Sequence, residues 1–254
     1  MAIPNNSVSF DRLTVASPEH IRQPALRQLA KRVQIETLGY EYEQSQTITR
    51  SYNSDQSELV LQRLHQTQIA DASILVAITH ERHPKLLLTR RASHMTSHAG
   101  EVSCAGGRYE YADGNNVVTA LREACEETAL PPNKVQLLGQ LPPQTSKSGM
   151  SVRPIVALIE PNLILMPEPG EIARIFWADF EALITQPTVE YEVEYRMQDH
   201  LEQTATLLTP SWQVDGETVW GLTGRVIANL LETGFDRQLE WYYRLQESGL
   251  ELDR

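Results

Sequence analysis

The chain of 254 residues contains few cysteines, an excess of acidic over basic residues and no long apolar run. Its two cysteines, Cys104 and Cys125, have no Cys-x-x-Cys partner, which argues against a thiolate metal site and favours a reducing compartment. The longest apolar runs, 74–78 and 155–159, are far shorter than the roughly 20 residues of a membrane span, so no membrane association is expected. Because 22 basic residues stand against 33 acidic ones, the formal net charge is −11, and no nucleic acid partner is expected.

The overall composition and the first residues narrow the class of protein. Hydrophobic residues make up 41% and charged residues 22% of the chain, which excludes disordered and fibrous classes and favours a buried core. Residues 1–6 contain neither a basic segment nor an apolar segment of the kind found in secretory signals. We therefore expect a cytoplasmic location.

Apolar periodicity and helix-breaking residues divide the chain into an N-terminal helical extension (1–68), a main domain (69–235) and a C-terminal tail (236–254). In the extension, Ser17 and Pro18 predict the start of a helix that ends at Gly39, and residues 58–65 predict a second helix. In the tail, apolar and aromatic residues are interspersed with charges. This pattern is typical either of a docking helix or of a contact with another subunit, so a homodimer is one expectation.

The main domain alternates short apolar runs with polar and proline-containing segments, as strands and their connections do. Residues 72–78 and 84–89 predict a buried β-hairpin. Further strands are expected at 135–141, 152–159 and 172–177, and an amphipathic helix is expected over 219–235.

A pair of glycines precedes a strongly amphipathic segment near the middle of the chain. The segment predicts a helix over 117–130, with its N-cap at Asn115 or Asn116. Gly106 and Gly107 are expected in a loop, where glycine lets the backbone approach a phosphate closely. Both glycines are therefore candidate substrate-binding residues.

Three carboxylates share one narrow arc of this helix, since successive residues are about 100° apart: Glu123, Glu126 and Glu127. Neighbouring like charges cost about 0.2–0.5 kcal/mol per pair, and the helix dipole disfavours anions in the last turns. A divalent cation removes both costs, so Glu123 and Glu127 are candidate ligands of one hard ion, whereas the alternative is a solvated acidic surface. Arg122 is expected to orient Glu126, one helical turn away, or to pair with Asp113.

The residues of this helix resemble the signature box of Nudix hydrolases, whose core is Arg-Glu-apolar-x-Glu-Glu-x-Gly-apolar. The matching residues are Arg122, Glu123, Ala124, Glu126, Glu127 and Leu130. The chain departs from the box at Asp113, which stands for an earlier Glu and is one residue further from Arg122 than usual. It also departs at Ala129, which replaces the usual Gly.

This resemblance implies a Nudix fold, an α+β fold in which a mixed β-sheet lies between helices. It also implies metal-dependent hydrolysis of a diphosphate, with Mg²⁺ or Mn²⁺ as the cofactor. Glu123 and Glu127 would be metal ligands, and Glu126 would be a further ligand or a base. In this family a carboxylate from a later loop often acts as base or additional ligand, which makes Glu171 a candidate.

An upstream segment resembles the additional motif of the coenzyme A diphosphatase branch. The resembling residues are Leu87-Leu88-Thr89-Arg90-Arg91-Ala92, Gly100-Glu101-Val102 and Gly106-Gly107, with Trp220-Gly221-Leu222-Thr223 further on. The chain departs from that motif at Thr96, where the motif has Arg, and at Cys104-Ala105, where it has Phe-Pro. The resemblance covers about residues 70–235. It implies cleavage of coenzyme A or an acyl derivative into a 4′-phosphopantetheine and adenosine 3′,5′-bisphosphate.

Several cations flank the box in a chain of net negative charge. Arg90, Arg91 and Arg108 are therefore expected to bind a polyanionic, coenzyme A-like nucleoside diphosphate substrate. Two alternatives remain open. One is a Nudix hydrolase of another nucleoside diphosphate derivative, such as ADP-ribose or a dinucleotide. The other is a Nudix-shaped binding or regulatory module without turnover, against which the intact carboxylates of the helix argue.

Overall fold

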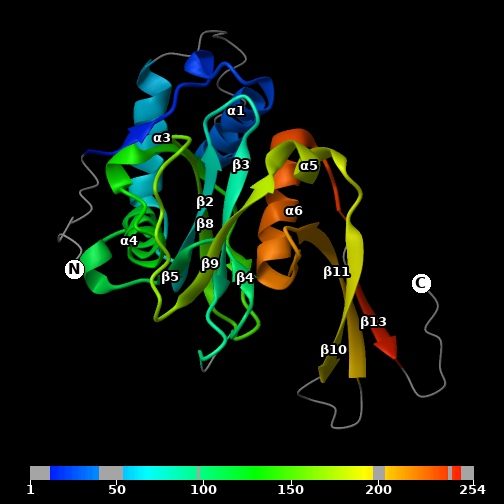
Figure 1. Cartoon of the computed structure of the whole chain (residues 1–254). Helices are drawn as coiled ribbons and strands as arrows, with labels where there is room; N and C mark the ends of the chain where they lie inside the picture. Colours follow the sequence, from blue (N-terminus) through cyan, green and yellow to red (C-terminus); the bar gives the residue numbers. More distant parts are fainter. Residues whose placement is uncertain (1–11, 40–53, 96–97, 197–203, 240–241, 247–254) are drawn as a thin grey trace.

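A nine-stranded mixed β-sheet runs through the middle of the molecule (Figure 1). The computed structural model describes residues 12–39, 54–95, 98–196, 204–239 and 242–246. The strands of this sheet are β1 (Thr14–Val15), β2 (Ala72–Thr79), β3 (Lys85–Arg91), β4 (Val102–Ser103), β5 (Gly106–Arg108), β6 (Val135–Gln140), β7 (Gln144–Thr145), β8 (Ser151–Ile159) and β9 (Ile172–Asp179). Their main order is β1-β6-β8-β2-β3-β4, with β5 beside β2, β7 beside β8 and β9 beside β3. The β2–β8 and β1–β6 pairs are parallel and the other pairs are antiparallel.

Helices cover both faces of this sheet (Figure 1). The α-helices are α1 (Pro24–Leu38), α3 (Ser54–Gln66), α4 (Asn116–Thr128), α5 (Phe180–Thr185) and α6 (Gly221–Phe235). Alternate residues of β2 face opposite sides, so Val76 belongs to the core under α1 and α6, and Leu75 belongs to the core under α3 and α4. The expected α+β fold with a mixed sheet between helices is therefore confirmed. No helix in the described part of the chain is long and apolar enough to cross a bilayer.

The N-terminal helix begins later than the sequence predicts. Pro18 opens only a single 3₁₀ turn, Pro18–His20, and α1 starts at Pro24 with Gln23 as its N-cap. The residue before a proline is disfavoured in the helical conformation, so a helix from Pro18 cannot run through Gln23 into Pro24. The predicted end is confirmed, because Gly39 follows the helix with a φ of +84°.

The N-terminal extension packs against the nine-stranded sheet of the main domain. Leu26 and Leu29 of α1 lie in one core cluster with residues of β2, β3 and α6. Strand β1 pairs in parallel with β6. The division at residues 68/69 and 235/236 stays a prediction.

A second, four-stranded antiparallel sheet follows the first and was missed from the sequence. It consists of β10 (Val189–Arg196), β11 (Thr204–Val214), β12 (Glu217–Val219) and β13 (Tyr242–Gln246). The described part of the tail forms β13, which pairs with β11, so the docking-helix alternative is wrong there. The contact with another subunit, and with it the homodimer, stays a prediction.

Ala129 at the end of α4 has a backbone conformation that glycine adopts more easily. Its φ is +56°, in the left-handed region, where a Cβ is unfavourable by about 1–2 kcal/mol. Glycine relieves this strain, but it also makes the unfolded chain more flexible, which cancels part of the gain. We therefore expect Ala129→Gly to raise the free energy of unfolding by up to about 1 kcal/mol. Urea denaturation of both proteins measures this change, and a destabilised glycine variant would contradict the account of this helix end.

Candidate active site

Helix α4 is tied to the start of the sheet at its N-terminus. The side chain of Asn115, one of the two predicted N-caps, accepts a hydrogen bond from the backbone N–H of Val118 at 3.0 Å. Asn116 is instead the first helical residue. Its buried amide accepts from the N–H of Ala70 and donates to the carbonyl of Gln68. These contacts fix the helix, and therefore its acidic face, relative to β2.

A loop between β8 and β9 closes the C-terminal end of α4. The backbone N–H groups of Met166 and Glu168 donate to the carbonyls of Thr128 and Glu127, at 3.0 and 2.9 Å. Carbonyls in the last turn of a helix have no partner within the helix, so this loop satisfies two of them. The docking brings Glu171, from the same loop, to the acidic face.

Arg122 joins the residues in front of α4 to its carboxylates. Its guanidinium donates to both carboxylate oxygens of Asp113, at 2.8 and 3.1 Å. It also donates to the carbonyl of Arg108 at 2.9 Å, and to Glu123 and Glu126 at 2.9 and 3.1 Å. Both expected roles of Arg122 are therefore present at once, because one planar guanidinium carries enough donors for all four partners.

Asp113 is the buried anchor of this network. Burial alone would raise its pKa, but hydrogen bonds from Arg122, the backbone N–H of Glu110 and the hydroxyl of Thr119 together hold the pKa below its ordinary value. Glu110 and Asp113 form a reciprocal capping box around the short turn before α4. The aspartate that departs from the Nudix box thus still forms the charged pair with Arg122.

Glu127 is the most buried carboxylate of the helix, with 4% of its surface exposed. It accepts a hydrogen bond from the N–H of Gly106 at 3.2 Å, and Arg91 lies 3.6 Å away. Burial raises the pKa of Glu127 to about 8, despite the opposing effects of Gly106 and Arg91. A carboxylate in this setting gains strongly from a cation at Oε1, the oxygen that Gly106 does not contact.

Glu123 lies against the strand that carries the glycine pair. A Cβ at Gly107 would overlap the carboxylate of Glu123, so a larger residue there would displace this carboxylate. Burial also raises the pKa of Glu123, and Arg122 opposes that shift. Gly106 and Gly107 form β5 beside β2, so the predicted loop is wrong, and both glycines contact carboxylates of α4.

Arg91 lies between Glu127 and Glu171. Its Nη1 is 3.6 Å from a Glu127 oxygen and 3.9 Å from a Glu171 oxygen, while its buried Nε has no hydrogen-bond partner among the described residues. The carbonyl of Glu171 accepts from the N–H of Ala92 at 2.7 Å, which holds the two segments together. Glu171 itself is half exposed, so it can be reached by water and substrate.

The acidic face provides the donor set that a hard divalent ion prefers. Glu123 and Glu127 offer carboxylate oxygens on adjacent turns, and the negative charge of Glu171 raises the pKa of both. Glu126 points outward, with 58% of its side chain exposed and Arg122 as its contact. Within the described residues no group of three His, Cys, Asp or Glu side chains is already drawn together as a complete ligand set. The residues therefore fit an ion that binds two protein carboxylates and completes its shell with water and substrate oxygens.

The remaining expected substrate contacts lie apart from this cluster. Arg90 pairs with Glu217 of β12 at 3.2 Å and points away from Arg91, because successive side chains of a strand point to opposite faces. Arg108 projects into a separate pocket, described below. Thr96 lies outside the described residues. The substrate-binding roles of Arg90 and Arg108 stay predictions.

Cys104 occupies the position of an aromatic residue in the coenzyme A motif. It is 2% exposed in the core under α1 and α6, and burial raises its pKa to about 12. A thiol with such a pKa is not a nucleophile near neutral pH, which agrees with a packing role. Ala105 is equally buried, and its carbonyl accepts from the N–H of Leu75.

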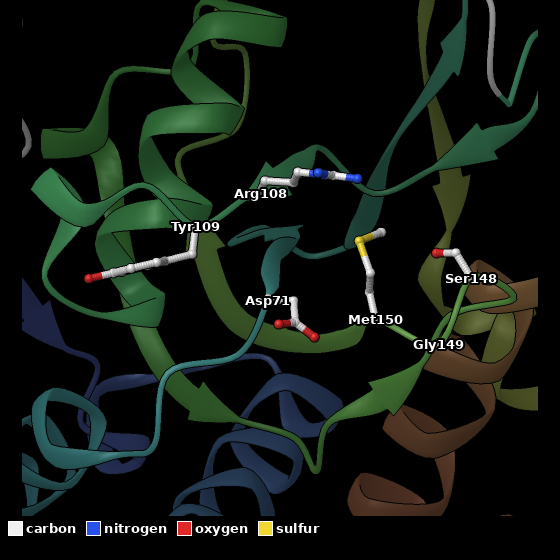
Figure 2. A pocket seen from close by; sticks show the side chains of 6 residues that line it. All are labelled: Asp71, Arg108, Tyr109, Ser148, Gly149 and Met150. Atoms are coloured by element: carbon white, nitrogen blue, oxygen red, sulfur yellow. The ribbon is translucent and has the colours of Figure 1, made fainter.

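A shallow pocket of about 460 Å³ lies at the end of β5 (Figure 2). Its lining residues are Asp71, Arg108, Tyr109, Ser148, Gly149 and Met150. Apart from Arg108, sequence reasoning missed these residues, because they come from three separate segments. In the sequence, the one local sign of a binding site at these residues was an aromatic residue, Tyr109, next to the cationic Arg108.

Metal affinity is expected to depend on pH, because Glu127 must lose its proton before it can bind a cation. Its pKa is raised from 4.5 to about 8, so protons compete with the cation below about pH 8. We expect the affinity for Mn²⁺ to fall by up to about tenfold per pH unit as the pH drops from about 8 to about 6. Isothermal titration at several pH values measures this slope, and an affinity independent of pH would contradict the assignment.

Comparison with known proteins gives matches over the segment that carries this site. The NUDIX domain family model matches residues 70–200. The protein "Uncharacterized Nudix hydrolase NudL" of Photorhabdus laumondii is 38% identical over 162 residues, which cover 63% of this chain and 83% of the relative. Its namesake from Pectobacterium atrosepticum is 38% identical over 171 residues, which cover 67% and 84%.

Solved structures give a weaker likeness. A MutT/nudix family protein from Enterococcus faecalis aligns with a TM-score of 0.39 and 13% identity, over 78% of this chain and 74% of that one, which is too low to support an argument. Membership of a family is therefore judged from the family model, whose match includes the acidic helix α4, and from the two relatives. The chain belongs to the Nudix hydrolase family, enzymes that act on pyrophosphate bonds.

Proposed function

We propose that the chain hydrolyses the diphosphate of coenzyme A or of an acyl derivative, with Mg²⁺ or Mn²⁺. The main support is the placement of the segment that resembles the coenzyme A motif. Its β3 part places Arg91 within 4 Å of both Glu127 and Glu171, and its glycine pair lies against Glu123 and Glu127. These contacts support binding of a diphosphate at the acidic face, which coenzyme A shares with other nucleoside diphosphate derivatives, and the resemblance of the motif carries the choice of coenzyme A.

In this proposal each residue around α4 has a separate task. Glu123 and Glu127 would hold the divalent ion, which, when bound, neutralises the diphosphate and lowers the pKa of the attacking water. Glu171, half exposed beside Arg91, would accept the proton from that water; Glu126 is the alternative base. Arg91 would donate to a phosphate oxygen through Nη1, since its distances of 3.6 and 3.9 Å to Glu127 and Glu171 are too long for hydrogen bonds.

Arg122 would serve as a positioning residue in this scheme. It contacts Glu123 and Glu126 through one nitrogen and Asp113 through the others, so it fixes how the acidic face is presented. The Gly106 N–H would hold one oxygen of Glu127 and leave the other for the ion. These roles need no movement of the helix, because the loop between β8 and β9 already fixes its end.

The substrate assignment predicts a preference for coenzyme A over dephospho-coenzyme A. Only the former carries a 3′-phosphate, and one charge-assisted hydrogen bond to it is worth about 1.5–3 kcal/mol, or roughly ten- to 150-fold in kcat/KM. We expect this ratio in an assay that includes both compounds, acyl derivatives, ADP-ribose, NADH and a metal-free control. Equal rates on the two coenzyme A compounds, or faster turnover of ADP-ribose, would instead support a hydrolase of another nucleoside diphosphate.

A further inference from the structure

The pocket at the end of β5 has walls that are fixed by backbone hydrogen bonds. The carboxylate of Asp71 accepts from the N–H of Ser151 at 2.8 Å, and its carbonyl accepts from the N–H of Tyr109 at 3.0 Å. In the turn between β7 and β8, the N–H of Met150 donates to the hydroxyl of Ser146 at 3.0 Å. The pocket is therefore formed before any ligand binds, as small-molecule sites usually are.

The pocket and the acidic face are separate, but both contact strand β5. The carbonyl of Arg108 accepts from Arg122, and the preceding Gly107 lies against Glu123. Arg108 is the next residue of the strand, about 3.3 Å further along, and its side chain leaves the opposite face of β5, since successive side chains of a strand alternate. A group joined to the reacting diphosphate would therefore pass the edge of β5 to reach this pocket.

The side chains of the pocket suit a nucleotide. Figure 2 shows Arg108 extending across the opening above the carboxylate of Asp71, with the thioether of Met150 pointing toward the guanidinium end of Arg108. A guanidinium can stack on a base or bind a phosphate, and a thioether packs well against an aromatic ring. An exposed carboxylate can accept hydrogen bonds from a ribose hydroxyl or an exocyclic amine.

We infer that this pocket binds the purine nucleotide half of the substrate. The other half of coenzyme A, the pantetheine arm, has neither a ring nor a charge beyond its phosphate, so it would match neither the arginine nor the thioether. A volume of about 460 Å³ lies within the range of about 300–1,000 Å³ that is usual for small-molecule sites. The inference rests on the proposed function in taking coenzyme A as the substrate, and it extends to any purine nucleoside diphosphate derivative.

Titration calorimetry with the two product halves tests this inference. The probes are adenosine 3′,5′-bisphosphate and 4′-phosphopantetheine, and the proteins are the parent, Arg108→Gln and the control Arg82→Gln. Arg82 is an exposed arginine at the opposite end of β2. We expect Arg108→Gln to weaken adenosine 3′,5′-bisphosphate binding roughly ten- to 150-fold and to leave 4′-phosphopantetheine binding unchanged, whereas Arg82→Gln should match the parent.

The signal of a labelled methionine in the pocket provides a second measurement of binding at this place. In protein labelled with ¹³C on the methionine methyl groups, adenosine 3′,5′-bisphosphate should shift the Met150 signal, which Met150→Leu identifies by its loss. The inference is overturned if the parent binds neither this nucleotide nor AMP, if a bound nucleotide leaves the Met150 signal in place, or if Arg108→Gln weakens 4′-phosphopantetheine instead. Failure of the proposed function looks different: coenzyme A is then not hydrolysed, yet AMP and ADP-ribose still bind in an Arg108-dependent way.

Discussion

The Glu127→Gln variant is expected to lose at least about a thousandfold in kcat/KM and to keep its fold. An amide has the size of the carboxylate and can still accept the hydrogen bond from Gly106, but it is a poor ligand for a hard cation. Because Glu127 is almost fully buried, no neighbouring side chain can take its place without repacking. Steady-state kinetics with saturating Mg²⁺ or Mn²⁺, together with a thermal melt, measure both parts of this result.

Glu36→Gln is the matched control for this experiment. Glu36 is an exposed glutamate on α1, and its neutralisation should leave both rate and melting temperature unchanged. If Glu127→Gln retained a rate within about threefold of the parent and melted at the same temperature, the assignment of α4 as the metal-binding helix would be wrong.

Arg122→Gln is expected to lower both activity and stability. The substitution leaves the carboxylate of Asp113, 3% exposed, without its two strongest donors, and removal of one partner from a buried ion pair is strongly destabilising. Since Arg122 itself is partly exposed, we expect a loss of about 2–3 kcal/mol in the free energy of unfolding and at least about a hundredfold in kcat/KM. Urea denaturation and steady-state kinetics measure the two losses.

A second substitution separates the structural from the catalytic role of Arg122. Asp113→Asn in the Arg122→Gln background removes the uncompensated charge, so it should recover part of the lost stability. It should not recover activity, because Glu123 and Glu126 remain without their arginine. Recovery of both together, or a single variant as stable as the parent, would contradict the positioning role.

Local sequence signals were sufficient to predict α4 and its acidic face. An N-cap at Asn115 or Asn116 and the arc shared by Glu123, Glu126 and Glu127 follow from spacing alone, and the structure places the N-cap at Asn115. The pairing of Arg122 with Asp113 was also predictable, because it joins neighbouring segments. These features depend on a few consecutive turns of chain, so periodicity encodes them.

Features that depend on the tertiary fold could not be predicted in the same way. The burial of Glu127 requires β5 to lie across the helix, and the ion pair of Arg90 with Glu217 joins residues that are 127 positions apart in the chain. In the second sheet only the pairing of β11 with β13, some 40 residues further along the chain, depends on the tertiary fold. Strands β10, β11 and β12 are consecutive antiparallel strands, and the alternation of apolar and charged residues in β10 is a local signal that was missed. Dependence on the tertiary fold also hid the pocket at the end of β5, whose residues meet only after folding.

The most direct test of the metal-binding helix is a titration of Mn²⁺ into the parent and into Glu127→Gln, followed by electron paramagnetic resonance at about pH 8. Free Mn²⁺ gives a strong signal that weakens when the ion binds to protein. The account predicts saturable binding to the parent and a loss of at least about tenfold in affinity in the variant, with Glu36→Gln like the parent. Identical Mn²⁺ binding by all three proteins would contradict it.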